Sequence, residues 1–212
     1  MGETVQRRRW LGRALGLERF SLAWMTAEGV VGVAAGASSR SLSLEVFGLD
    51  SLIEIISAWA VLSRLRTEME ERSLPAGLAR VEAAERRAAR VVAACLLGLA
   101  LYIVAGVTWS VRVRELPHPG VFGFAVAISA IVVMPPLWRA KQKIGRALGS
   151  AALREDGVGN LACAGMAVIL LTGLVALRGG WWWADPLASL ALGLLVAREG
   201  WEAWQHAREG GG

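Results

Sequence analysis

The chain has 212 residues, of which 55% are hydrophobic, and its mean hydropathy is +0.46. This composition is typical of a multi-pass membrane protein and excludes an ordinary soluble domain. The net charge of +5 would also suit a nucleic-acid-binding protein, so the distribution of the charges along the chain has to decide between the two.

Six apolar runs account for most of the length, at about residues 20–37, 43–63, 88–111, 120–138, 155–177 and 183–204. A helix needs roughly 20 apolar residues to cross a bilayer, so each run predicts one span. With both termini in the cytoplasm, nineteen of the 23 Lys and Arg residues lie on the inner side. This bias obeys the positive-inside rule, so the basic charge indicates orientation in the lipid bilayer and no nucleic-acid partner.

We therefore predict an all-α membrane protein with six transmembrane helices, both termini cytoplasmic and no soluble C-terminal domain. Residues 1–19 form a basic cytoplasmic tail, residues 20–204 the transmembrane domain, and residues 205–212 a short cytoplasmic tail. The chain has 21 Arg and only 2 Lys, which points to a GC-rich prokaryotic genome. The expected location is the bacterial inner membrane.

The first two runs carry acidic side chains that are costly to place in hydrocarbon. Glu28 lies within the first run, and the second run contains Asp50 and Glu54 in the stretch FGLDSLIEIISA. Asp50 and Glu54 are four residues apart, so on a helix they lie on the same face. The turn SSRS between the two runs is short, which predicts that the two helices are antiparallel neighbours.

The middle of the chain is poorer in such side chains. Residues 64–90 are predicted to form a solvated internal loop, in which Pro75 and Gly77 separate two short helical pieces. Pro135 and Pro136 are expected to end or kink the fourth run. A basic helical linker then leads into the fifth run without a clear break.

A second pair of polar side chains begins the fifth run, in the stretch REDGVGNLACAG. Asp156 and Asn160 are again four residues apart, and Cys163 follows about one turn later. In the sixth run, Asp185 and Pro186 form a typical helix start. We expect Asp185 to cap that helix rather than to bind a ligand.

Packing of the second run against the fifth would bring four oxygen-bearing side chains together, those of Asp50, Glu54, Asp156 and Asn160. Buried charges persist only when they are paired or bound to a metal, and no Lys or Arg lies in the middle of any run. We therefore predict a divalent-cation site. Protons would compete with the metal for these carboxylates, and this competition is the physical basis of metal/proton exchange.

These motifs resemble those of the cation diffusion facilitators, a family of metal/proton antiporters. The stretch GASSRSLSLEVFGLDSLIEIISAWAVL resembles the family's first-to-second-span region, and Asp50 and Glu54 fall on its metal pair. EDGVGNLACAG and WWWADPLASLALGLLVAREG resemble the fifth and sixth spans. The likeness is closer to a sub-branch of short cation transporters. It implies a transporter that is not an enzyme and that forms a homodimer.

The chain departs from the family pattern in the fifth span, where two registers fit. In one, Asn160 takes the position of the family's histidine, Asp156 lies one turn above, and Ala164 replaces the second aspartate. In the other, Asp156 and Asn160 are themselves the metal pair. No span contains a histidine, and carboxylate and amide oxygens suit manganese, and iron(II) somewhat less well. The resemblance favours zinc, so zinc, manganese and iron(II) all stay candidates.

Two further residues have alternative roles. Glu28 is a candidate proton carrier or a partner of the metal ligands, or else it pairs with an internal Arg. Cys163 is a candidate soft ligand, although a buried Cys in a span is usually a packing residue. The sequence thus favours a divalent-metal exporter driven by proton antiport, with no organic cofactor. The alternative is a membrane sensor or scaffold that binds metal without transporting it.

Overall fold

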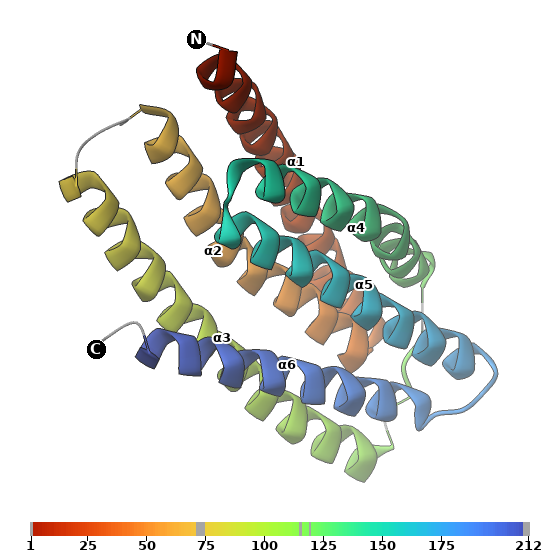
Figure 1. Ribbon diagram of the computed structural model, residues 1–212. Helices are drawn as coiled ribbons and strands as arrows, with labels where there is room; N and C mark the ends of the chain where they lie inside the picture. The colour runs from red at the N-terminus through yellow and green to blue at the C-terminus, as the bar shows by residue number, and fades with distance from the viewer. Residues whose placement is uncertain (1, 71–74, 115, 119, 210–212) are drawn as a thin grey trace.

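The computed structural model is built from helices, with no strand in the part of the chain that it describes (Figure 1). It describes the backbone of residues 2–70, 75–114, 116–118 and 120–209, and the side chains of residues 6–66, 86–114, 116–118 and 120–205. The helices are α1 (Gly2–Ser39), α2 (Leu42–Glu70), α3 (Pro75–Val113), α4 (Val121–Leu148), α5 (Ala151–Arg178) and α6 (Ala184–Glu209). The predicted all-α fold is confirmed.

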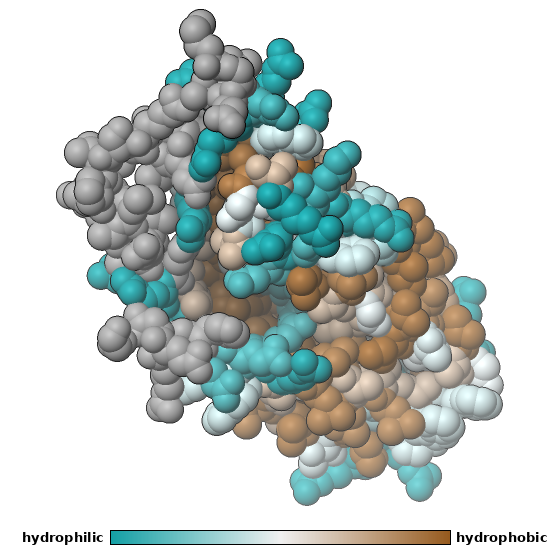
Figure 2. All heavy atoms as spheres, in the orientation of Figure 1, coloured by the Kyte–Doolittle hydropathy of each residue, from teal (hydrophilic) through white to brown (hydrophobic). Residues whose placement is uncertain are grey.

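Five of these helices are long and apolar enough to cross a membrane, over Gln6–Ser39, Leu42–Arg66, Arg86–Val113, Val121–Leu148 and Ala151–Arg178. Helix α6 is not among them, because charged residues interrupt its apolar sequence at Asp185, Arg198, Glu199 and Glu202. Figure 2 shows apolar side chains over the middle of the bundle and polar ones towards its ends. The six predicted spans are therefore matched by six helices, five of which have the composition of a span.

The helices form a closed ring in the order α1, α2, α3, α6, α5 and α4, with α4 packed back against α1. Helix α2 also contacts α5 and α6 across the ring, which makes it the central helix. The core between the helices is apolar and includes Met25, Phe47, Leu96, Ile103, Met134, Leu170 and Leu192. This arrangement brings the polar face of α2 opposite α5, as the sequence predicts.

Helix α1 begins much earlier than the first apolar run. Residues expected to form a basic tail over 1–19 are helical from Gly2 onwards. Leu11, Ala14 and Leu15 of this segment are buried in a second apolar cluster, which also contains Ile144 of α4 and Leu153 of α5. The start of α1 is therefore packed against the bundle instead of leaving it.

Helix α4 continues through Pro135 and Pro136 and ends only at Leu148, so the two prolines do not end it. The break before α5 falls at Gly149, which has a left-handed φ of 70°, and at Ser150, whose hydroxyl accepts from the Leu153 N–H at 3.3 Å. The expectation of a linker without a clear break is wrong. The loop expected over residues 64–90 is largely helical: residues 64–70 continue α2, and residues 75–90 belong to the long helix α3 rather than to a short piece. Only the breaking point at Pro75, where α3 begins, is as predicted, and Gly77 lies inside that helix.

Helices α1 and α2 approach each other closely because glycines line their interface. A Cβ built on Gly32 would lie 2.9 Å from the Gly48 Cα, and one built on Gly36 would lie 2.5 Å from the Glu45 N. Small residues allow such backbone approach between membrane helices. The two helices are joined by Arg40, with φ of 56°, and Ser41, so the predicted tight antiparallel turn is confirmed.

Asp185 caps a helix, but that helix is α2 and not its own. Its carboxylate accepts hydrogen bonds from the Leu42 N–H at 2.9 Å and from the hydroxyls of Ser41 and Ser43, each at 2.6 Å. The prediction that Asp185 caps α6 is therefore wrong. Because Asp185 is 1% exposed, it places a buried negative charge at the N-terminus of α2, where the helix dipole favours an anion.

We expect Asp185→Ala to lower the free energy of unfolding by about 1–3 kcal/mol, because it removes the acceptor of two serine hydroxyls and of the Leu42 and Ser43 N–H groups in a buried position. Thermal unfolding of the purified protein in detergent measures the effect. Asp185→Asn keeps one acceptor oxygen and is expected to lose less. An alanine variant that unfolds at the temperature of the parent would contradict this role.

Candidate metal centre

The two acids of α2 are buried, and their charges are not compensated within the described side chains. Asp50 is 1% exposed, and neither of its carboxylate oxygens has a hydrogen-bond partner among the residues that the structure describes. One turn further along, the Glu54 Oε2 is also buried without a partner there. Carboxylate oxygens in this state are expensive unless a cation or a proton neutralises them.

Asn160 of α5 lies on the opposite side of the α2–α5 contact. It is 2% exposed, and its Nδ2 donates to the Met134 sulfur at 3.5 Å, while its Oδ1 has no partner in the described region. The Glu54 Oε1 lies 3.5 Å from the position that a Cβ on Gly159 would occupy. The Glu54 carboxylate therefore approaches α5 at Gly159, as the predicted pairing of the two helices requires.

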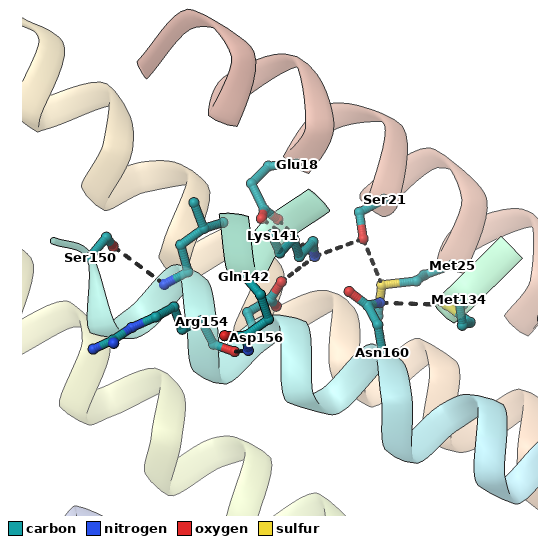
Figure 3. Close-up of polar contacts among 11 residues, drawn as sticks. Glu18, Ser21, Met25, Met134, Lys141, Gln142, Ser150, Arg154, Asp156 and Asn160 are labelled. Carbon is teal, nitrogen blue, oxygen red and sulfur yellow. Dashed lines mark hydrogen bonds and ion pairs between the residues drawn. The ribbon is translucent and has the colours of Figure 1, made fainter. Parts of the chain in front are cut away.

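Asp156 has a different environment, because it forms an ion pair with Lys141 of α4 (Figure 3). The Lys141 Nζ also lies 3.4 Å from each carboxylate oxygen of Glu18 and donates to the Ser21 hydroxyl at 3.0 Å. Lys141 and Glu18 are fully buried. The expectation that no cation is available to the intramembrane acids is therefore wrong for Asp156, which shares Lys141 with an acid of α1.

A cavity of about 490 Å³ lies beside these groups, between α2, α3, α5 and α6. Asp50 lies outside it, and its polar lining consists of Glu54, Ser57, Arg64, Glu155, Asp156, Asn160 and Glu199. The face drawn in Figure 2 is hollowed near the start of α5. Glu199 was missed in the sequence analysis, although an acid within the last third of the sixth apolar run is a signal of the kind that Asp50 and Glu54 gave.

The two residues with alternative roles are both buried. Glu28 is 5% exposed, and neither of its oxygens has a partner among the described side chains, so it does not pair with an Arg there. It is near enough to Asp50 and Glu54 to interact with them electrostatically.

Cys163 is fully buried within the apolar core, beside Ala164. In the described part of the chain, no three His, Cys, Asp or Glu side chains are arranged as a closed metal site.

The sequence of this chain matches the cation efflux transmembrane domain over residues 20–208, which includes all of the candidate metal ligands. The chain belongs to the cation diffusion facilitator family. It is 26% identical over 177 residues to the magnetosome protein MamB of Magnetospira sp. (strain QH-2), and the match covers 84% of this chain and 59% of MamB. The chain thus spans about 59% of the length of that relative.

This match confirms the family resemblance of the sequence motifs and makes the chain a multi-pass membrane protein of a family of metal cation transporters. In this cation diffusion facilitator, the two polar residues of the fifth span, Asp156 and Asn160, have different surroundings. The Asn160 Nδ2 donates to the Met134 sulfur and its Oδ1 has no partner in the described region, whereas Asp156 forms an ion pair with Lys141, which also lies near Glu18. Asp156 thus has a cation partner within the described region, and the Asn160 Oδ1 has none there.

Proposed function

We propose that this protein exports a divalent metal cation from the cytoplasm in exchange for protons. The binding site in this proposal is formed by Asp50 and Glu54 of α2 and Asn160 of α5, with Asp156 one turn along α5. The observation that carries it is the set of buried oxygens without hydrogen-bond partners in the described region, on Asp50, Glu54 and Asn160. A divalent cation would supply the interaction that these oxygens lack.

The same oxygens support proton exchange. When no cation is beside it, a buried carboxyl group is neutralised by a proton, so metal binding releases protons and proton binding releases metal. Glu28 is a further buried acid without a hydrogen-bond partner among the described residues, and it is near the α2 pair. In our proposal Glu28 carries a proton to or from Asp50 and Glu54.

The donor set bears on the choice of metal. Asp50, Glu54 and Asn160 offer oxygen donors only, which suit manganese and iron(II) better than zinc. Cys163 is packed in the apolar core, which supports a packing role. We therefore propose manganese or iron(II) ahead of zinc as the substrate. The family resemblance implies a homodimer, and the excess of Arg over Lys suggests the bacterial inner membrane as its location.

The proposal is tested by reconstituting the protein into liposomes with an acidic lumen and adding zinc, manganese, iron(II) or cadmium outside. We expect metal to enter as protons leave, and Asp50→Asn to lower the rate more than about 100-fold because it removes a charged ligand. Glu45→Gln is a matched control, since Glu45 lies on the same helix but accepts a hydrogen bond from the Tyr102 hydroxyl at 2.9 Å. Metal binding without flux for any of the four metals would overturn transport.

A further inference from the structure

Glu199 is an acid of α6 that the family resemblance gives no role. It is partly buried and lines the cavity together with Glu54 of α2 and Asn160 of α5. Its neighbour Arg198 forms an ion pair at 2.8 Å with Glu202, and those two side chains are 74% and 50% exposed. Glu199 is thus partly buried and lines the cavity, whereas the neighbouring Arg198–Glu202 pair is exposed.

Glu199 adds its charge to the acids of α2. It is close enough to interact electrostatically with Glu54 and with Asp50, although it comes from a helix that follows them by more than 140 residues. The cavity lining carries four acids, Glu54, Glu155, Asp156 and Glu199, against one base, Arg64. Low-dielectric walls strengthen the attraction of such a surplus of acidic side chains for cations. The cavity thus has negative side chains on two facing helices.

The size and polarity of the cavity suit a cation that keeps its water. A water molecule occupies about 30 Å³, so an ion with six waters needs roughly 200 Å³, less than the 490 Å³ available. A buried polar atom in the cavity wall also points to a ligand. Asn160 is 2% exposed and lines this cavity, and its Oδ1 has no partner within the described side chains.

We propose that Glu199 and Glu54 form a loading site in this cavity, where a hydrated divalent cation binds before it passes to Asp50, Glu54 and Asn160. This inference rests on the proposed function and extends it to α6. The ion exchanges water for carboxylate and amide oxygens in two stages, first at the cavity walls and then between α2 and α5. Glu199 therefore sets the affinity for arriving metal, while Asp50 is required for the ion to cross.

The test uses inside-out membrane vesicles, in which the cytoplasmic face is outside, with manganese and zinc as the probes. Glu199→Gln is expected to raise the KM for metal about tenfold and to leave kcat within about twofold, because the charge acts on arrival. Glu202→Gln is the matched control on the same helix, and we expect it to leave both constants unchanged. Glu199→Asp restores the charge and should return the KM to within about threefold of the parent.

Equilibrium binding of manganese to the purified protein in detergent provides a readout that does not depend on flux. Glu199→Gln should weaken this binding about tenfold, whereas Glu202→Gln should not change it. Unchanged KM and unchanged binding in Glu199→Gln would overturn the loading site even if Asp50→Asn abolishes transport. Absence of transport in the parent would instead overturn the proposed function, and the binding measurement would still decide the role of Glu199.

Discussion

Replacing Lys141 with methionine is expected to lower the free energy of unfolding by about 3–5 kcal/mol, because it removes one member of a buried ion pair. The ammonium group is fully buried and is shared by Glu18 of α1 and Asp156 of α5. Methionine has a similar length and keeps the packing of the stem. The variant therefore leaves two buried carboxylates on neighbouring helices without their cation.

Thermal unfolding in detergent measures this loss, and Lys143→Met is the matched control because Lys143 is exposed two residues further along α4. A second variant separates charge from packing. Combining Lys141→Met with Asp156→Asn removes one of the two unpaired acids, so we expect it to be more stable than Lys141→Met alone. Equal unfolding temperatures for Lys141→Met and Lys143→Met would show that the ion pair contributes no stability.

The sequence was sufficient to predict the parts of the site that follow from helical spacing. Asp50 and Glu54 share a face because they are four residues apart, and Asn160 lies opposite them because the family-like fifth span packs on the second. The apolar runs predicted every helix, since a run of about 20 apolar residues has few other folds in a membrane. The shared face of Asp50 and Glu54 depends on their spacing along one helix, and the packing of α5 on α2 depends on the resemblance of these spans to those of the family.

The ion pair of Asp156 could not be predicted in this way. The apolar run of the fourth span ends near residue 138, so hydropathy places Lys141 in a linker. In the structure, α4 continues through two prolines to Leu148 and includes Lys141. Glu18 was likewise counted with a basic tail, although α1 begins at Gly2. Hydropathy locates the apolar part of a helix and does not show how far the helix extends or which neighbour covers its ends.

Helix α6 shows a further limit of sequence spacing, because both of its important acids act on other helices. Asp185 near its start accepts hydrogen bonds from the first turn of α2, and Glu199 near its end lines a cavity with Glu54. The Asp-Pro pair at its start predicts that Asp185 caps α6 itself, because sequence spacing indicates only partners within the same helix. Only the contact between α6 and α2 across the ring indicates that Asp185 binds the start of α2.

Gly48→Ala is the second change for which we expect a large effect, a loss of about 3 kcal/mol or more in the free energy of unfolding. A Cβ at Gly48 would lie 2.4 Å from the Val33 N, 2.8 Å from the Gly32 C and 2.9 Å from the Gly29 O. All three are backbone atoms of α1, so no side chain can rotate away to make room. The methyl group therefore has to push α1 and α2 apart.

Gly98→Ala is the matched control for this change, because a Cβ at Gly98 meets nothing within 4 Å. Alanine is favoured over glycine inside a helix by about 1 kcal/mol, so the control should be as stable as the parent or slightly more stable. Because Gly48 precedes Asp50 by two residues, separation of α1 from α2 also displaces the candidate metal ligands. We expect Gly48→Ala to weaken manganese binding as well as to lower the unfolding temperature, and parent-like values of both would show that the two helices are not held at this distance.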